Sequence, residues 1–208
     1  MQSFLKRNNK IIKLLIICFF VFSQTPESQS RDRLAHSCFK PVNKTCQAIA
    51  ELKPTMNLDK ALQLSNHFYN VARKYGLPAY LLVSIAMQES GMRLDIVRAV
   101  KGLTLGEDGI YRPASVDSDF CMMQINASNI LKFNLDAARL LSDPFYCIQA
   151  GAVILKDSEK RFAKSENAWW TRYNASSKIH RKNYHEHILK HWRKIDPQAE
   201  HPPIEIEP

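Results

Sequence analysis

The sequence lacks the patterns that mark several large protein classes. It has no internal repeats and no low-complexity tracts, which excludes a repeat architecture. Its cysteines form no CxxC pair, which excludes a four-cysteine zinc site of the usual spacing. The N-terminal apolar run, residues 14–22, is shorter than the roughly 20 residues that a membrane-spanning helix needs. No segment resembles a nucleic-acid-binding fold, and positive charge alone is poor evidence for one.

What is present is a chain of 208 residues, 45% of them hydrophobic, which is enough for one domain with a core and tails. We expect this domain to be a monomer. The formal charge is +9, and 25 basic residues stand against 20 acidic ones once the four basic residues of the first 23 are set aside. This excess suits attraction to an anionic polymer at low salt, and a solvated basic surface gives the same count.

The N-terminus has the order of a secretory signal peptide. Lys6, Arg7, Lys10 and Lys13 precede the apolar run, and a polar stretch follows it. We therefore predict a signal peptide over residues 1–23 and a periplasmic location. If the segment stays uncleaved, it would instead anchor the chain to the membrane.

Export makes disulfides the expected state of four cysteines, because an oxidising compartment lets thiols pair. Cys38, Cys46, Cys121 and Cys147 form an even set with three possible connectivities. The short separation between Cys38 and Cys46 favours a bond between them, which leaves Cys121 for Cys147.

Composition divides the rest of the chain into three parts. Residues 24–54 are polar with little periodicity, and they predict a tether that the Cys38–Cys46 bond closes on itself. Residues 55–195 carry helical periodicity and predict the folded domain. Residues 196–208 are rich in proline and predict a disordered tail.

Within the predicted domain, the clearest helices cover residues 58–75 and 78–90. Gly76 ends the first helix, Pro78 opens the second, and Gly91 suits a left-handed C-cap. Residues 94–118 predict an irregular loop that forms a binding wall. The run "FCMMQI" after it predicts a buried strand or an extended turn.

Further helices are predicted toward the C-terminus. Asn126 or Ser128 can cap one of them, and Asp143 with Pro144 forms an N-cap and N1 pair for the next. Gly151 and its two alanine neighbours keep one side of that helix thin for close packing.

Four short motifs occur in a fixed order along this predicted domain. They are "MQESGM", "MMQIN", "DPFYCIQAGAVIL" and "YNAS". Together they resemble the soluble lytic transglycosylases, and in particular the small exported members associated with conjugation and type IV secretion systems. The resemblance covers residues 58–192. It implies a mainly α, lysozyme-like (α+β) domain, helical with a small β or extended cleft segment. It also implies peptidoglycan glycan strands as substrate, apparatus proteins as further partners, and neither a cofactor nor a metal.

Glu89, at the end of the apolar stretch "LPAYLLVSI", is the candidate catalytic residue. Cleaving a glycosidic bond near neutral pH needs a carboxylic acid that holds its proton, and apolar surroundings raise the pKa of a carboxyl group. From the residues alone, a helix-end carboxylate paired with Arg93 or Arg73 is the alternative. The resemblance implies that Glu89 protonates the leaving oxygen and then accepts a proton from the C6 hydroxyl of the sugar, which yields a 1,6-anhydromuramoyl end.

Ordinary glycosidases use two carboxylates. The resemblance implies that one suffices here, because the acetamido group of the substrate stabilises the cation-like centre. Five residues are candidates for a second acid, and their loop positions favour solvated or turn-forming roles: Asp95, Glu107, Asp108, Asp117 and Asp119.

The resemblance also implies a substrate-binding set around "MMQIN". Met123 would be the apolar floor of the sugar cleft, and the Gln124 amide would meet sugar hydroxyls or acetamide groups. A buried strand with a satisfied amide is the alternative for Gln124. Ser115, with Ser118 as second choice, would contact the acid or the acetamido group, and Asn126 completes this part of the set.

In "YNAS", Tyr173 resembles the cleft tyrosine that lies near the acid and orients it, with Asn174 beside it as a binding residue. A core aromatic patch with Trp169 and Trp170 is the alternative for Tyr173. Tyr184, on a stripe with Ile188 and Trp192, resembles a tyrosine that closes the domain, and we assign it to packing.

This sequence departs from the family pattern at two motif positions. Cys121 and Ser176 stand where the family usually has glycine. A bond between Cys121 and Cys147 would account for the first departure.

The C-terminal histidines allow a metal interpretation, since His187 and His191 lie one helical turn apart. No carboxylate sits at zincin spacing and no third ligand is evident, so a solvated basic helix face is favoured over a metal site. The same holds for His180 and His185.

Three functions are therefore compared. The leading prediction is an exported lytic transglycosylase that opens the cell wall locally. The second is a hydrolytic muramidase on the same scaffold, in which water replaces the C6 hydroxyl. The third is a wall-binding assembly protein without turnover, for which Cys121 and Ser176 are the only indications.

Overall fold

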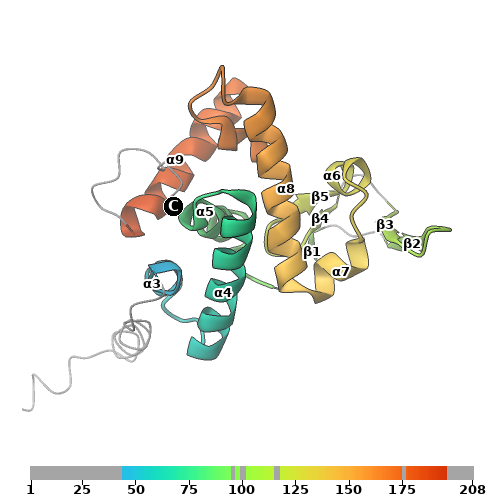
Figure 1. Cartoon of the computed structure of the whole chain (residues 1–208), viewed down its shortest axis with the longest axis horizontal. Helices are drawn as coiled ribbons and strands as arrows, with labels where there is room; N and C mark the ends of the chain where they lie inside the picture. Colours follow the sequence, from blue (N-terminus) through green and yellow to red (C-terminus); the bar gives the residue numbers. More distant parts are fainter. Residues whose placement is uncertain (1–43, 95–96, 99–101, 115–117, 175–176, 196–208) are drawn as a thin grey trace, which may run out of the picture.

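The computed structural model describes residues 44–94, 97–98, 102–114, 118–174 and 177–195 (Figure 1). Helices dominate, and short antiparallel strands lie between α5 and α6, which confirms the predicted mainly α fold class. In chain order the elements are α3 (Lys44–Leu52), α4 (Leu58–Tyr75), α5 (Ala79–Ser90), β1 (Val97–Arg98), β2 (Leu103–Leu105), β3 (Tyr111–Pro113), β4 (Asp119–Phe120), β5 (Ile125–Asn126), α6 (Ala127–Lys132), α7 (Ala137–Ser142), α8 (Pro144–Phe162), the 3₁₀ helix η1 (Trp169–Tyr173) and α9 (Lys178–Ile195).

The ends of α4 and α5 follow from local sequence signals. The Asn57 side chain accepts hydrogen bonds from the first backbone N–H groups of α4, and Gly76 ends that helix with a φ of 59°. Pro78 is the N-cap of α5, and Gly91 ends it with a φ of 62°. Both predicted helices are therefore confirmed, and Glu89 lies in the last turn of α5.

Helix α3 corrects the prediction of a polar tether up to residue 54. Its apolar side, which includes Ala48 and Ile49, is buried in the core, and the helix packs against α4, α5 and α9. Nine residues are too few to show a clear helical period in the sequence. The folded unit therefore begins at least as early as Lys44.

Helix α5 is the central helix of the molecule. Residues 81–86 are all buried, because α3, α4, α8 and α9 surround the helix. The continuous apolar stretch before Glu89 is explained by this position, since a helix covered on all sides needs no polar face. Glu89 is thus placed at the end of a helix that other helices surround.

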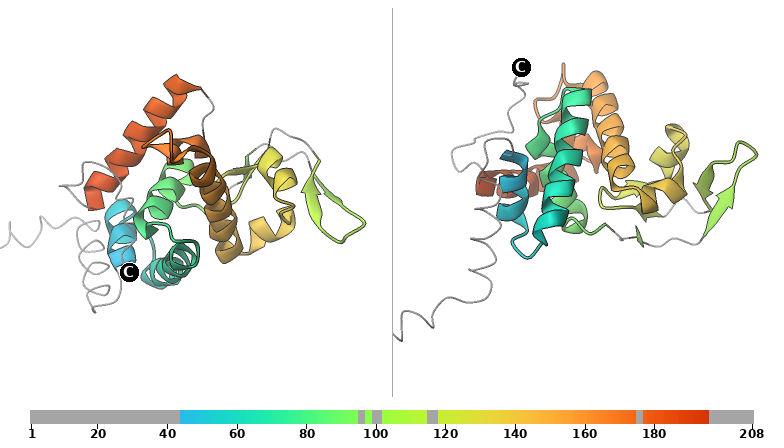
Figure 2. Two further views of the ribbon diagram at one scale, coloured as in Figure 1. Left: turned by 45° about the horizontal axis from the view of Figure 1, so that its top comes forward. Right: turned by 60° about the horizontal axis from the view of Figure 1, so that its bottom comes forward.

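Helix α8 lies between this helical group and a smaller part that contains the strands, α6 and α7 (Figures 1 and 2). One sheet has the order β1-β4-β5, and Phe120 pairs with Ile125 across β4 and β5. The second sheet is the hairpin β2–β3, which extends away from the rest of the molecule in each view (Figure 2). Residues 94–118 were predicted as an irregular loop, so this hairpin is a correction.

Arg112 explains why the hairpin forms. Its guanidinium group donates hydrogen bonds to Asp108 within the hairpin and to Asn134 beyond α6. These contacts join the hairpin to the rest of the smaller part.

The predicted bond between Cys121 and Cys147 is confirmed. It joins the turn after β4 to the first turns of α8. Cys46 is also disulfide-bonded, but Cys38 lies outside the described residues, so its pairing with Cys46 stays a prediction. The signal peptide and the tail from residue 196 lie outside them as well.

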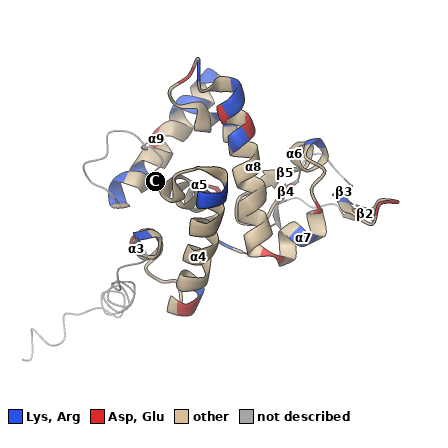
Figure 3. Ribbon diagram, in the orientation of Figure 1, with Lys and Arg blue, Asp and Glu red and all other residues tan. Residues whose placement is uncertain are grey.

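Lysine and arginine side chains are frequent on α9 and toward the C-terminal end of α8 (Figure 3). Some of this charge is paired, since Arg181 of α9 meets Glu166, which also pairs with Arg172 of η1. Among the described helices, none has the length and apolar character needed to cross a membrane.

Candidate active site

Glu89 is buried, with 8% of its side chain exposed, and its carboxylate is held by two side chains that come from distant elements. The Tyr184 hydroxyl donates to Oε1 at 2.7 Å. The Asn174 amide, in the segment after η1, donates to Oε1 at 2.9 Å and to Oε2 at 3.1 Å. The sequence pattern thus identified the position, and the structure adds the groups that orient the carboxyl group.

Tyr184 therefore belongs to the site, which corrects its assignment to packing alone. It lies on α9 and is buried together with Ile188 and Trp192, so the packing part of that assignment is confirmed. Burial raises the pKa of the Tyr184 hydroxyl well above its usual value, and the charge of Glu89 and the hydrogen bond to it raise it further. Tyr184 remains a hydrogen-bond donor to the acid at any working pH.

Tyr173 has a different contact from the one that the resemblance implies. Its hydroxyl donates to the backbone carbonyl oxygen of Met123 at 2.8 Å, so it fixes the turn beside the site and is not the donor to Glu89. Burial raises the pKa of Tyr173 well above its usual value, followed by the charges of Glu89 and Asp119. Tyr173 is thus close enough to Glu89 to be affected by its charge, while the hydrogen bond to the Glu89 carboxyl group comes from Tyr184.

The turn between β4 and β5 has an unusual backbone. Cys121 and Gln124 both have a positive φ, 58° and 48°, a conformation that non-glycine residues rarely adopt. The Gln124 backbone N–H and its side-chain Nε2 both donate to the Cys121 carbonyl oxygen, at 3.0 and 2.8 Å. Together with the bond to Cys147, these contacts hold the positive φ of Cys121.

The Gln124 side chain has one polar atom without a hydrogen-bond partner among the described residues. This atom, Oε1, is buried. A buried acceptor without a partner costs about 1–3 kcal/mol, so such an atom beside a candidate site suggests a ligand donor. The amide is therefore only partly hydrogen-bonded within the described residues, and its binding role stays a prediction.

Met123 does not form an exposed floor. Its side chain is fully buried and packs against Gly151 of α8. A Cβ atom at Gly151 would lie 2.7 Å from Met123 Cε and 3.3 Å from Tyr173 Oη. The side of α8 that was predicted to allow close packing therefore contacts Met123 of the turn and the Tyr173 hydroxyl.

The remaining predicted site residues differ in placement. The Asn126 side chain caps α6 by accepting from the Asn129 N–H, so its oxygen serves the fold. Ser118 is buried, and its carbonyl oxygen accepts from the Ala127 N–H. Ser115 and Ser176 lie outside the described residues, and their predicted roles stay predictions.

Arg93, considered as a partner of Glu89, contacts the neighbouring serine. Its Nε donates to the Ser90 carbonyl oxygen, and its backbone N–H donates to Ser90 Oγ. Ser90 Oγ in turn donates to the Ala86 carbonyl oxygen. The serine of "MQESGM" thus stabilises the end of the helix that carries the acid.

Among the candidates for a second acid that the structure describes, Asp119 is near the site. It lies on β4, and its charge contributes to the raised pKa of Tyr173. Asp108 is paired with Arg112 in the hairpin, as a turn-forming role predicts, and Glu107 is exposed there. Asp95 and Asp117 lie outside the described residues.

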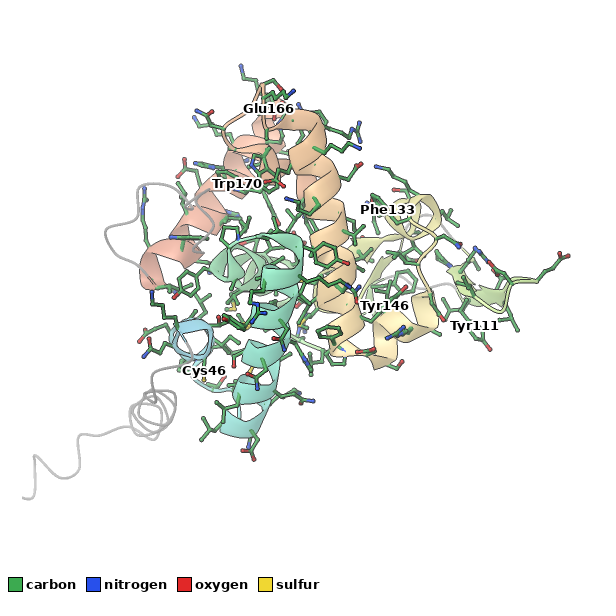
Figure 4. The ribbon with its side chains drawn as sticks, in the orientation of Figure 1. Cys46, Tyr111, Phe133, Tyr146, Glu166 and Trp170 are labelled. Atoms are coloured by element: carbon green, nitrogen blue, oxygen red, sulfur yellow. A yellow bond between two sulfur atoms is a disulfide. The ribbon has the colours of Figure 1, made fainter. Side chains whose placement is uncertain are left out.

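Three histidines of α9 contact other side chains, which a fully solvated helix face would not show. His187 and His191 both contact Gln88, and His185 stacks on Trp170, which is labelled in Figure 4. No group of three potential metal ligands occurs in the part of the chain that the structure describes.

A mainly helical fold with a buried glutamate at the end of its central helix, beside a turn with two positive φ angles, is consistent with a lysozyme-like domain. Residues 66–191, more than half of the chain, match the family model described as the transglycosylase SLT domain. The chain therefore belongs to the transglycosylase SLT-domain family. A search among curated proteins and a search among solved structures each found no match. Family membership supports lytic transglycosylase activity on peptidoglycan.

Proposed function

We propose that this protein is a peptidoglycan lytic transglycosylase in which Glu89 acts first as general acid and then as general base. The observation that carries the proposal is the buried carboxyl group of Glu89, held by Tyr184 and Asn174 beside the turn that contains Gln124. A structural carboxylate at a helix end needs neither this burial nor two neutral donors. An acid that must keep its orientation through proton transfer benefits from both.

The hydrogen bonds orient the carboxyl group that carries the transferable proton. Oε1 accepts from Tyr184 at 2.7 Å and from Asn174 at 2.9 Å, while Oε2 has the longer 3.1 Å contact with Asn174. Both oxygens are therefore oriented by neutral donors, and Glu89 is proposed to hold its transferable proton on this carboxyl group. Burial disfavours the charged carboxylate, which helps the group keep this proton until the substrate binds.

The reaction then needs one acid and no external nucleophile. Glu89 donates its proton to the glycosidic oxygen between MurNAc and GlcNAc, and the bond from that oxygen to the MurNAc C1 breaks. The substrate acetamido group stabilises the positive centre at C1. The C6 hydroxyl of the same MurNAc bonds to C1, and its proton passes to the Glu89 carboxylate, which restores the acid and leaves a 1,6-anhydroMurNAc end.

Gln124 is proposed as the group that recognises the acetamido function. Its buried, unpartnered Oε1 can accept a hydrogen bond from the acetamido N–H group. Such a bond would supply the partner that the amide oxygen otherwise lacks.

Mass spectrometry of the muropeptides released from purified sacculi tests the proposal. We expect the protein to release fragments that end in 1,6-anhydroMurNAc. Fragments that end only in reducing MurNAc would mean that water is the acceptor and that the protein is a muramidase. Release of no fragments, despite binding to sacculi, would favour a wall-binding protein without turnover.

The muramidase alternative is supported by one observation, the position of Asp119 close enough to Tyr173 to affect its pKa. A second carboxylate near the acid could activate a water molecule. The variant Asp119→Asn separates the alternatives, because a hydrolytic enzyme would lose most of its turnover. A transglycosylase that relies on Glu89 alone would keep most of it.

We further propose that the protein acts in the periplasm after export and opens the wall for a secretion or conjugation apparatus. The signal-like N-terminus, the disulfide-bonded Cys121 and Cys147, and the resemblance to exported members support this. Cell fractionation, with and without residues 1–23, tests the location. Recovery of the full chain in the cytoplasm would contradict it.

A further inference from the structure

The residue before the acid is held by α9 at two points. Gln88 precedes Glu89 on α5, and its Nε2 lies 3.2 Å from His187 Nδ1. Its Oε1 lies 3.2 Å from His191 Nε2. One amide group therefore spans two imidazole rings that are one turn apart on α9.

The chemistry of the amide fixes the state of both rings. An amide NH₂ group only donates, so His187 Nδ1 accepts and the ring proton lies on Nε2. An amide oxygen only accepts, so His191 Nε2 carries the proton and donates. With the amide in this orientation, His187 accepts through Nδ1, and His191 fits a neutral ring that donates through Nε2.

The surroundings of His191 favour this neutral state. Its Nδ1 atom is buried and has no partner among the described residues, so a second proton there would be a buried, unpaired donor. Burial, followed by the nearby positive charges, chiefly those of Lys194 and Lys190, lowers the pKa of His191 from 6.5 to about 4.

We propose that Gln88, His187 and His191 form a positioning clamp that fixes α9 along α5 and so keeps the Tyr184 hydroxyl on Glu89. His187 and His191 lie three and seven residues after Tyr184, so all three share one face of α9. The apolar residues of the same face, Ile188 and Trp192, attract the two helices without fixing their relative position, because apolar contact is non-directional. Hydrogen bonds from one amide to two rings do fix it.

Gln88 is thus a positioning residue that acts through Tyr184. The proposal rests on the proposed role of Glu89 as the acid. If the clamp slips, the 2.7 Å bond from Tyr184 to Glu89 weakens while the substrate-binding turn stays in place. Loss of the clamp should therefore lower kcat and leave KM unchanged.

Four variants of the full chain test this with kinetics on sacculi or a defined glycan. Gln88→Met keeps the length of the side chain without the amide, and His187→Leu removes one partner. Each should lower kcat about 3- to 10-fold with KM unchanged, the range expected for the loss of partly exposed hydrogen bonds. His187→Asn, whose amide oxygen can replace Nδ1 as the acceptor, should restore most of kcat. In a Tyr184→Phe background, Gln88→Met should have little further effect.

Two kinetic results would overturn the proposal. One is a wild-type kcat in Gln88→Met. The other is a double variant whose loss of kcat equals the product of the losses of Gln88→Met and Tyr184→Phe. Such independent effects would mean that Gln88 acts on general stability and not through Tyr184.

NMR gives a readout that needs no turnover. The ¹⁵N shifts of both rings should identify neutral Nε2–H tautomers, and the hydroxyl proton of Tyr184 should exchange slowly with solvent. Gln88→Met should speed that exchange, and His187→Asn should leave it slow. A proton on Nδ1 of either ring, or exchange unaffected by Gln88→Met, would reject the clamp. An inactive wild type with the expected NMR signals would instead reject the proposed function and keep the clamp.

Discussion

Tyr173 and Tyr184 are both buried beside the same carboxyl group, yet they support different parts of the site. Tyr184 comes from α9 and donates directly to Glu89. Tyr173 comes from η1 and donates to the Met123 carbonyl oxygen in the turn between β4 and β5. The comparison separates a region that orients the acid from a region that shapes the binding turn.

The two regions are stabilised by different means. On the α9 side, directional hydrogen bonds from uncharged side chains fix the position of the acid. On the turn side, a covalent bond between Cys121 and Cys147 and the close approach of Gly151 hold a backbone with positive φ values. Variants of the first region should therefore affect the rate of chemistry, and variants of the second should affect stability and substrate binding.

Removal of the disulfide should give the largest effect on the turn region. The double variant Cys121→Ser/Cys147→Ser should lose about 2–5 kcal/mol of unfolding free energy, because the bond closes a loop with a sequence separation of 26. Chemical denaturation measures this loss. Reductant should destabilise the wild type more than the double variant, and the difference should be of similar size. The double variant is the control, because reductant breaks the bond of Cys46 in both proteins. Equal stability of the two proteins would show that the turn needs no covalent support.

The two tyrosines should respond differently to the loss of their hydroxyl groups. Tyr184→Phe should lower kcat by about 10- to 100-fold, because the carboxylate that forms as Glu89 gives up its proton would lose a hydrogen bond, and a hydrogen bond to a charged group is worth about 1.5–3 kcal/mol. Tyr173→Phe should mainly raise KM and lower the melting temperature, since it frees the Met123 carbonyl. Steady-state kinetics with thermal unfolding on both variants measure the contrast. If Tyr173→Phe gave the larger loss of kcat, the assignment of the two regions would be reversed.

The substitution Gly151→Ala tests the close approach of α8 to the turn. Helix propensity alone favours alanine over glycine by about 1 kcal/mol. The added Cβ would nevertheless lie 3.3 Å from both Met123 Cγ and Tyr173 Oη, and crowding of this kind costs about 1–3 kcal/mol. We therefore expect a net loss of stability by chemical denaturation. Ala150→Gly on the same helix is the control for propensity, and a gain in stability from Gly151→Ala would mean that the turn yields easily.

The smallest effect concerns the dependence of stability on pH. Burial lowers the pKa of His191 from 6.5 to about 4, so between these values the unfolded chain binds a proton that the folded chain does not. Stability should therefore fall as pH drops from 6.5 toward 4. Gln88, Lys190, Lys194 and His187 all face or influence this ring, so the control must change His191 alone. His191→Gln should flatten this part of the pH profile in thermal unfolding, and an unchanged slope would assign it to other groups.

Much of this fold could be predicted where the signals are local. Gly76, Pro78 and Gly91 set the ends of α4 and α5, and Glu89 was singled out because it ends a buried apolar stretch within a motif that resembles the family. Helix α3 was missed because it is short and its apolar residues are buried by elements far along the chain. Local pattern carries no information about such contacts.

The partners of the acid were harder to predict for the same reason. Tyr184 occupies a position on an apolar stripe that any packing residue could fill, and only the placement of α9 against α5 brings its hydroxyl to Glu89. The one available signal in the sequence was the hydroxyl group of Tyr184 on a stripe whose other members, Ile188 and Trp192, are apolar. The contact of Gln88 with two histidines gave no comparable signal, because it spans about a hundred residues of sequence.

The substitution Glu89→Gln tests the central claim, that one buried glutamate carries the chemistry, most directly. Glutamine keeps the shape and the hydrogen bonds to Asn174 and Tyr184 through its amide oxygen, but it has no proton to transfer at working pH. We expect an unchanged melting temperature, retained binding to sacculi, and release of anhydromuropeptides slowed by about 10²- to 10⁴-fold, the range for lost acid–base catalysis. Glu107→Gln, on the exposed hairpin, should release them at the wild-type rate. Release by Glu89→Gln at the wild-type rate would contradict the account and move the acid to another residue, with Asp119 the first to examine.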